Sequence, residues 1–159
     1  MSHEAEIVLT PAGWKKLEER LGNLRNVQRR EVAERIRDSR QFGDIAENAE
    51  YEGAKNEQAI IESQISELRH VLQVAQVLDY DEIPTDHVGI GSIVQLTSLD
   101  TDDEWECTIV SSVEADPDND LISDESPLGE ALIGKKLGEI ARVNAPNGAL
   151  QYRVDGIRK

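Results

Sequence analysis

The hydrophobic pattern of the chain changes near its midpoint. Up to about residue 80, apolar residues recur at intervals of three and four, which is the spacing of an amphipathic helix. Beyond residue 90, short β-branched runs alternate with Gly, Pro, Asn and Asp, a pattern typical of strands and turns. The acidic stretch 81–89 between them contains Pro84 and favours a linker. We therefore predict two domains, at 1–80 and 90–159, joined by the linker 81–89.

The first helix is predicted between Pro11 and Gln41. Thr10 can cap its start, and Pro11 suits the first helical position because its missing N–H has no partner to lose there. Gly43 can end the helix in the left-handed conformation. The apolar stripe of this helix consists of Leu17, Leu21 and Leu24, followed at a shifted phase by Val32 and Ile36.

A second helix is predicted to follow at once and to run to about Ala75. Counted back in alternating steps of three and four, its seam is Ala75, Leu72, Leu68, Ile65, Ile61, Gln58, Ala54, Tyr51 and Glu47. Two helices of roughly 30 residues with so short a connection must fold back as an antiparallel coiled-coil hairpin. The aliphatic contact is expected at the base of the hairpin, where Leu17, Leu21 and Leu24 can meet Leu68, Leu72 and Ala75. Toward the tip the seam is predicted to become polar.

The second half of the chain is predicted to mix strands with one short helix. Alternation favours strands over 93–97 and 105–113, and a hairpin of 140–145 with 149–154 around a Pro-Asn-Gly turn. Ser126 and Pro127 can begin a helix that ends near Ile133. The predicted fold class is therefore α+β: a long antiparallel α-helical hairpin followed by a small antiparallel α+β domain.

The charge balance limits how the protein can contact nucleic acid. The chain has 17 Lys or Arg against 32 Asp or Glu, a formal charge of −15, which argues against nucleic-acid binding over the whole surface. Residues 15–40 reverse this sign, with nine basic and five acidic residues. One cysteine and three scattered histidines indicate neither a disulfide nor a zinc site. With no apolar run long enough for a membrane span, we expect a cytoplasmic protein without membrane contact.

The segment 40–51, at the predicted tip, carries the most informative chemistry. Asp44 and Glu47 stand three residues apart at the start of the second helix. One interpretation is a capping box, in which Asp44 caps the helix and Glu47 reaches back. The other is a pair of hard oxygen ligands for Mg²⁺, which usually takes one or two protein carboxylates and completes its shell from water and phosphate. The two interpretations are compatible with each other.

A basic face is predicted on the first helix. Arg29, Arg30, Arg37 and Arg40 fall within about 100° on a helical wheel, away from the leucine stripe. These side chains can form a solvated flank paired with the nearby acids Glu31, Glu34 and Asp38. Alternatively, they can guide a single-stranded, phosphate-rich chain toward the tip. The local reversal of sign favours the second interpretation.

The same segment resembles the tip of the bacterial Gre transcript cleavage factors of the GreA type. The similar residues are the run from Gly43 to Tyr51, with Arg40 before it and Ala54-Lys55 after it. Two further stretches match the family, Leu9 to Gly13 near the start and Ser126 to Lys135 in the second half. The resemblance therefore covers nearly the whole chain and favours the metal interpretation of Asp44 and Glu47.

The resemblance implies a function inside another enzyme. A coiled coil of this family enters the secondary channel of bacterial RNA polymerase, and an FKBP-like C-terminal domain docks on the channel rim. Asp44 and Glu47 would then hold a catalytic Mg²⁺ jointly with the polymerase, so that the polymerase cuts backtracked RNA and resumes elongation. The protein is expected to be a monomer, to have no enzymatic activity of its own, and to bind Mg²⁺ only weakly when alone.

The resemblance also implies contacts to the RNA. Arg40 and Lys55 match the family's basic positions and are expected to contact the 3′ end of the backtracked RNA. Arg37 and Arg30 are added to this set from the helical wheel. The remaining tip residues, Gly43, Asn48 and Tyr51, are expected to support the tip, with Tyr51 packing across the seam.

Three alternative functions remain at this point. A Gre-like paralogue would enter the same channel and inhibit, but such relatives tend to have a more acidic tip than the spaced Asp44 and Glu47. A peptidyl-prolyl isomerase would need an aromatic-lined apolar pocket, for which the second half offers Trp105 and Tyr152. A coiled-coil adaptor would use the tip acids as caps alone.

Overall fold

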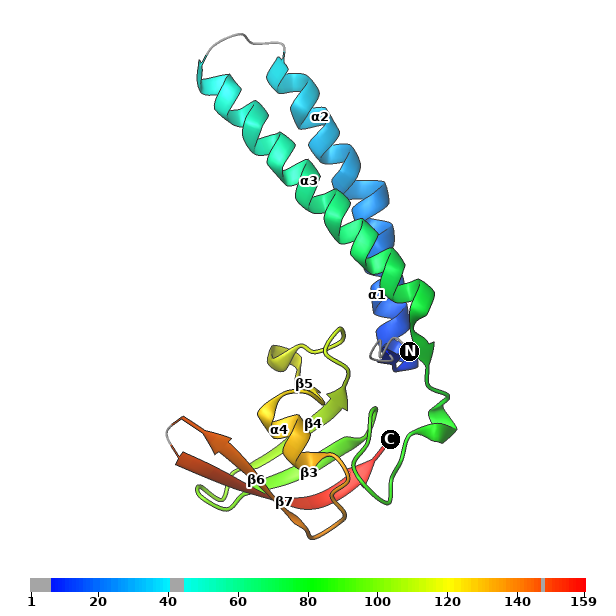
Figure 1. Ribbon diagram of the computed structural model, residues 1–159, viewed down its shortest axis with the longest axis vertical. Helices are drawn as coiled ribbons and strands as arrows, with labels where there is room; N and C mark the ends of the chain where they lie inside the picture. Colours follow the sequence, from blue (N-terminus) through cyan, green and yellow to red (C-terminus); the bar gives the residue numbers. More distant parts are fainter. Residues whose placement is uncertain (1–6, 41–44, 147) are drawn as a thin grey trace, which may run out of the picture. The chain divides into compact units, whose positions relative to one another are not determined.

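The structure is a computed structural model that describes residues 7–40, 45–146 and 148–159, with the backbone alone for 45–48. The chain forms two compact units (Figure 1). The helical unit is Trp14–Val74, and the sheet unit combines the described residues of Met1–Gly13 with Ala75–Lys159. No helix in the described ranges has the length and apolarity that crossing a membrane would require.

The helical unit is the predicted antiparallel hairpin. Its elements are α1 (Pro11–Asn23), the π-helical turn η1 (Leu24–Gln28), α2 (Arg29–Arg40) and α3 (Ile45–Val74). Figure 1 shows α2 and α3 side by side along their length. The start of α1 is also as predicted, because the Gly13 backbone N–H donates to the Thr10 hydroxyl at 3.0 Å.

The aliphatic seam of the hairpin extends farther than the sequence pattern predicted. Its buried residues are Leu17, Leu24, Val32 and Ile36 on one side and Ala54, Ile61, Ile65, Leu68 and Val71 on the other. Val32 and Ile36 in α2 are 1% and 8% exposed, which confirms the predicted apolar stripe of the first helix, whereas the expectation that the aliphatic contact is confined to the base was wrong. Val71 is buried where Leu72 was predicted, and Ala75 lies beyond the end of α3.

The π-helical turn η1 explains the shifted phase of the apolar stripe. In an uninterrupted heptad pattern the residue seven positions after Leu24 would face α3, but the buried residue is Val32, eight positions later. A π-helical turn accommodates one extra residue, and η1 lies between these two positions. The extra residue is absorbed there, so Val32 and Ile36 return to the same seam as Leu24.

The sheet unit contains a five-stranded sheet and one short helix. The strands are β3 (Ile93–Ser98), β4 (Glu104–Val110), β5 (Leu121–Ser123), β6 (Ile140–Ala145) and β7 (Gly148–Arg158), in the order β5-β4-β3-β7-β6. Every neighbouring pair is antiparallel except β4 with β5. The helix α4 (Pro127–Leu132) packs against β6 and β5, and the Ser126 hydroxyl caps it by accepting from the Gly129 N–H. The α+β class is confirmed.

Strand β5 was not predicted, and two further parts of the sheet unit also differ from the sequence prediction. The segment predicted as a linker, 81–89, contributes Val88 to the core at 0% exposure and Ile83 at 7%. The Val88 N–H donates to the Lys135 carbonyl at 2.8 Å, so this segment is hydrogen-bonded to the domain. The burial of Ile83 and Val88 therefore makes segment 81–89 part of the domain, although its composition is acidic.

The second difference is a pair of two-residue strands, β1 (Val8–Leu9) and β2 (Gln76–Val77), which are parallel and were not predicted. Next to β1, the Glu114 carboxylate accepts from both the Thr10 N–H, at 2.9 Å, and the Thr10 hydroxyl, at 2.7 Å. A Cβ at Gly13 would overlap this carboxylate, so a larger residue there would displace Glu114 from Thr10. These bonds fasten residues 7–13 to the rest of the sheet unit.

Candidate functional site

The end of the hairpin lies between Arg40, the last residue of α2, and Ile45, the first residue of α3. The backbone of Glu47 and Asn48 is therefore in the first turn of α3. Gly43 and Asp44 lie outside the described residues, as do the side chains of Glu47 and Asn48. The roles of these four residues, including the capping and the metal interpretations, stay predictions.

Two described side chains close to this end, Arg40 and Tyr51, meet across the hairpin. An Arg40 terminal nitrogen donates to the Tyr51 hydroxyl oxygen at 3.2 Å, and the guanidinium carbon lies 5.4 Å from the centre of the ring. Arg40 is exposed and Tyr51 is half-buried. This combination of a hydrogen bond and a cation–π contact joins the last turn of α2 to the second turn of α3.

The electrostatics of this pair follow from that geometry. The hydrogen bond from Arg40 lowers the pKa of the Tyr51 phenol, and the positive charges of Arg40 and then Lys55 act in the same direction. The same hydrogen bond raises the pKa of Arg40. Lys55 stands one helical turn after Tyr51 and donates to the Gln58 side-chain oxygen at 3.2 Å. The described tip thus holds two cations around one phenol.

Ion pairs farther along the hairpin revise the predicted basic face. Arg29 forms a two-point contact with Glu62 at 2.7 and 2.8 Å, and Arg35 pairs with Glu57 at 2.6 Å. Both pairs connect the two sides of the hairpin rather than neighbouring turns of one helix. Arg29 is therefore neutralised by α3, and not by the acids of its own helix that the sequence suggested.

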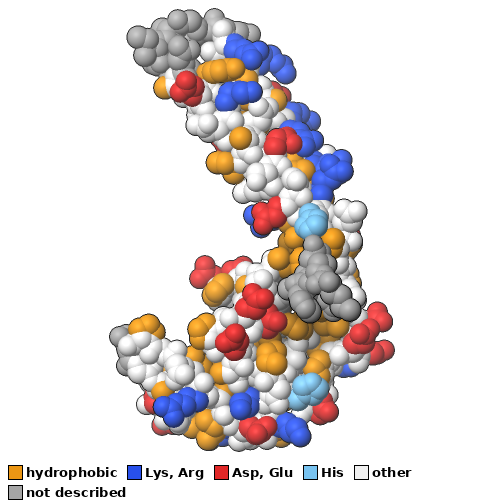
Figure 2. All heavy atoms as spheres, viewed as in Figure 1, with side chains coloured by type: hydrophobic (Ala, Val, Ile, Leu, Met, Phe, Trp, Pro, Cys, Tyr) orange, Lys and Arg blue, Asp and Glu red, His pale blue; other side chains and the backbone are white. Residues whose placement is uncertain are grey.

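The other predicted members of the basic face remain on the surface. Arg30 and Arg37 are exposed, and within the described ranges neither forms an ion pair. Figure 2 shows Lys and Arg side chains following one edge of the hairpin toward its end, with acidic side chains among them. The cations available to a phosphate chain along α2 are thus Arg30, Arg37 and Arg40.

A pocket in the sheet unit bears on the isomerase alternative. It has a volume of about 430 Å³, and its lining includes His87, Val88, Ile90, Asp124, Glu130 and Ile133, with no Phe, Tyr or Trp among the described residues that line it. A second pocket, of about 410 Å³, contains Trp105 but is otherwise lined largely by charged side chains. Neither pocket is the aromatic-lined apolar cradle that an isomerase needs.

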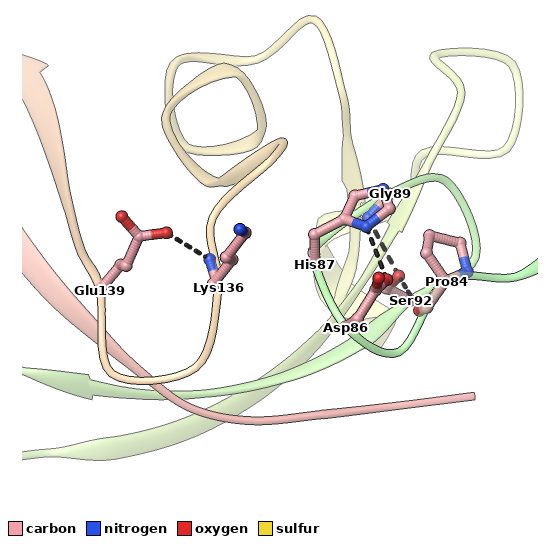
Figure 3. A network of polar contacts seen from close by, with 7 residues as sticks. All are labelled: Pro84, Asp86, His87, Gly89, Ser92, Lys136 and Glu139. Carbon is pink, nitrogen blue, oxygen red and sulfur yellow. Dashed lines mark hydrogen bonds and ion pairs between the residues drawn. The ribbon is translucent and has the colours of Figure 1, made fainter.

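The loop beside the first pocket is held by a polar network. The buried Ser92 hydroxyl donates to the Pro84 carbonyl at 2.8 Å and accepts from the Gly89 N–H at 3.0 Å (Figure 3). The hydrogen bond with His87 is the main cause of the lowered pKa of Asp86. These bonds satisfy the polar groups of the loop locally, so they indicate a structural role.

The acidic loop 116–124 also contains structural bonds. The Asp116 carboxylate accepts from the Asn119 side chain at 2.6 Å, and the Asp120 carboxylate accepts from the Trp105 indole N–H at 2.8 Å. In the part of the chain that the structure describes, no three His, Cys, Asp or Glu side chains gather into a group that could hold a metal ion.

Comparisons with known proteins agree on one family. Residues 7–77 match the family described as transcription elongation factor, N-terminal, and residues 83–159 match transcription elongation factor, GreA/GreB, C-terminal. The chain is 50% identical to transcription elongation factor GreA of Acetivibrio thermocellus and 46% identical to that of Clostridium kluyveri, over 159 residues and the full length of each. It is also similar to the crystal structure of GreA factor homolog 1 of Thermus thermophilus, at 29% identity, 97% and 99% coverage of the two chains and a TM-score of 0.46. The chain belongs to the GreA/GreB family of transcription elongation factors.

Proposed function

We propose that the protein rescues stalled transcription by stimulating the polymerase's own cleavage of backtracked RNA. In this proposal the end of the hairpin enters the secondary channel of bacterial RNA polymerase, and the sheet unit docks outside it. Membership in the GreA/GreB family supports the general role. The position of the Gre-like segment 43–51, which follows α2 in the sequence and includes the first two turns of α3, supports the proposed mode of action.

That position is the observation that carries the proposal. Because α2 ends at Arg40 and α3 begins at Ile45, Asp44 directly precedes α3 in the sequence, and the backbone of Glu47 lies in the first turn of α3, at the end of a hairpin only two helices wide. A narrow element of this kind can enter a channel that a compact domain cannot. The exposed cations Arg30 and Arg37 lie on the way to this turn.

The donor set at the turn fits a shared magnesium ion. Asp44 and Glu47 supply carboxylate oxygens, the ligand type that Mg²⁺ prefers, and two carboxylates are the usual protein share of such a site. A second metal ion in a phosphodiester-cleaving site stabilises the attacking and leaving oxygens. Two carboxylates alone hold the ion weakly, so we expect tight binding only when the polymerase provides the other ligands.

The remaining tip residues would bind and orient the RNA. Arg40 and Lys55 carry the charges that contact phosphates near the 3′ end, and Arg37 and Arg30 extend this contact along α2. Gly43 and Asn48 would support the turn, where the Asn48 amide can both donate and accept hydrogen bonds. The protein itself provides no nucleophile in this scheme, so RNA incubated with the protein alone should stay intact.

The test uses stalled bacterial polymerase complexes that contain end-labelled RNA. Adding the protein with Mg²⁺ should shorten the RNA, release its 3′ fragment and restore elongation. Complexes without the protein should cleave far more slowly. A protein that enters the complex and slows elongation without shortening the RNA would instead be the inhibitory paralogue, and the proposal would be wrong.

The metal role is tested with two matched variants in α3. Glu47→Gln removes a proposed ligand, whereas Glu50→Gln makes the same change of charge at an exposed position one turn later. We expect the Mg²⁺ concentration for half-maximal cleavage to rise for Glu47→Gln and to stay at the wild-type value for Glu50→Gln. An equal response of both variants would indicate a general charge effect and would argue against a ligand role for Glu47.

A further inference from the structure

Tyr51 has contacts that a residue serving only to fill the hairpin seam would not need. Its hydroxyl oxygen accepts from Arg40 at 3.2 Å while its ring lies 5.4 Å from the guanidinium carbon. The ring is half-buried, so it is held by the hairpin, whereas Arg40 is exposed. A fixed aromatic side chain on α3 therefore contacts the most terminal described cation of α2.

The partners of the tip cations differ in kind from those farther along the hairpin. Arg29 and Arg35 pair with carboxylates, which cancel their charges. Arg40 is held by the Tyr51 phenol and Lys55 by the Gln58 amide oxygen, and both of these acceptors are uncharged. Within the described part of the tip, the cations are thus oriented without being neutralised.

We infer that Tyr51 is a positioning residue for RNA binding: it holds the Arg40 guanidinium across the hairpin beside Lys55, so that both cations meet the same stretch of RNA phosphates. The inference rests on the proposed function. Tyr51 and Lys55 are four residues apart and so lie on one face of α3, and Tyr51 brings Arg40 to that face from the other helix.

Electrostatics and entropy both support this arrangement. The hydrogen bond and charge of Arg40, with a smaller contribution from the charge of Lys55, lower the pKa of Tyr51, as expected for a phenol with two cations nearby. An arginine side chain loses considerable rotamer freedom when it binds a phosphate. Because Tyr51 restricts Arg40 before the RNA arrives, part of that loss has already occurred, and binding is stronger for the same contact.

A double-mutant cycle tests the inference. The cleavage rate in stalled polymerase complexes is measured at saturating protein for wild type, Tyr51→Leu, Arg40→Ala and the double variant. Tyr51→Leu should lower the rate roughly three- to tenfold, the range expected for one side chain that must be ordered on binding. The double variant should be no slower than Arg40→Ala, because Tyr51 acts through Arg40. Additive losses would overturn the inference.

A conservative variant and a measurement without polymerase separate positioning from folding. Tyr51→Phe keeps the ring under the guanidinium and removes the hydroxyl acceptor, so its cleavage rate should lie between those of wild type and Tyr51→Leu. In the isolated protein, NMR of the terminal guanidinium N–H protons of Arg40, one of which donates to Tyr51, should show faster exchange with water in both variants. Unchanged exchange in Tyr51→Leu would contradict the inference, even if that variant destabilises the hairpin.

The outcomes distinguish the inference from the proposed function. A wild-type protein that releases no RNA fragment would overturn both. A wild-type protein that cleaves normally, combined with an Arg40→Ala variant that also cleaves normally, would overturn the role of Tyr51 and leave the metal role of Asp44 and Glu47 standing.

Discussion

The helical unit and the sheet unit use their polar side chains differently. In the sheet unit, the buried polar side chains Ser92 and Thr97 are bonded within the unit, Ser92 to its own loop and Thr97 to Asp155. In the helical unit, the buried residues are aliphatic, and the charged residues lie outside the seam. Buried polar side chains therefore contribute to stability in the sheet unit, whereas in the hairpin the charged surface is separate from the aliphatic seam.

This difference predicts how substitutions should behave. The described candidates for RNA binding, Arg30, Arg37, Arg40 and Lys55, are all exposed, so replacing them removes charge without opening a cavity. A change in the core of the sheet unit should instead unfold that unit. The following predictions test this separation, from the largest expected effect to the smallest.

Leu96→Ala should destabilise the sheet unit strongly. Leu96 is 1% exposed on the central strand β3, and truncation of such a residue costs about 2–5 kcal/mol. Alkylation of the single cysteine, Cys107, reports opening of this unit because the thiol is buried on the neighbouring strand β4. In mild denaturant, Leu96→Ala should accelerate alkylation while the helical circular dichroism of the hairpin persists.

The matched control is Leu137→Ala, the same change at a residue that is 67% exposed. Its alkylation rate should stay at the wild-type value. Simultaneous loss of helix and thiol protection in Leu96→Ala would show that the two units unfold together, which would contradict the separation.

The buried Cys107 thiol should make the free energy of unfolding of the sheet unit depend on pH. Burial, with smaller contributions from Asp120 and Glu106, raises the pKa of Cys107 from 9.0 to about 12. Because the folded state keeps the thiol protonated longer than the unfolded state, stability is lost as pH rises from 9 toward 12. At pH 10 the loss should be about 1–2 kcal/mol by this linkage. Denaturant titrations of wild type and Cys107→Ala should show this additional loss in the wild type alone.

The variants Arg37→Ala and Arg35→Ala compare an arginine that is available to RNA with one that is held in an ion pair. Both residues are exposed on α2, but Arg35 is paired with Glu57. We expect Arg37→Ala to slow RNA cleavage roughly two- to fivefold, the effect of one exposed charge, and Arg35→Ala to have little effect. The difference should shrink at high salt because screening weakens exposed charges. Equal losses in both variants would contradict a specific path along α2.

Deletion of Asn26 should have the smallest effect. Removing one residue from η1 allows a regular helix in which Leu24 and Val32 keep facing the seam, so the free energy of unfolding should change by less than about 0.5 kcal/mol. Deleting Glu34 from the regular part of α2 instead rotates all that follows by about 100° and should destabilise the hairpin clearly. Similar melting temperatures for the two deletions would contradict our explanation of the shifted stripe.

The sequence predicts the elements that carry a strong local signal. The helical hairpin, α4 and the longer strands follow from caps, apolar spacing and turn residues near each element. The strands β1 and β2 have two residues each, too few to show a period, and they pair Val8 with Gln76, which are separated in the sequence by the whole hairpin. The linker prediction at 81–89 rested on composition, which gave no weight to the burial of Ile83 and Val88.

For the candidate site, too, the sequence predicts local features but not contacts between the two helices. The tip segment is contiguous, so its motif could be recognised in the sequence. The pairing of Arg29 with Glu62 and of Arg40 with Tyr51 depends on the register between two helices, including the residue absorbed by η1. A helical wheel of one helix contains no such information, and it therefore assigned Arg29 to the exposed basic face.

The central claim is that Asp44 acts as a metal ligand in the polymerase and is more than a helix cap. Asn caps a helix about as well as Asp but is a poor ligand for Mg²⁺, so Asp44→Asn should leave helicity and melting nearly unchanged. Asp38→Asn, the same substitution at an exposed position of α2, serves as the control. We predict that Asp44→Asn abolishes RNA cleavage in stalled polymerase complexes while Asp38→Asn retains it. Cleavage by Asp44→Asn at the wild-type rate would contradict the account.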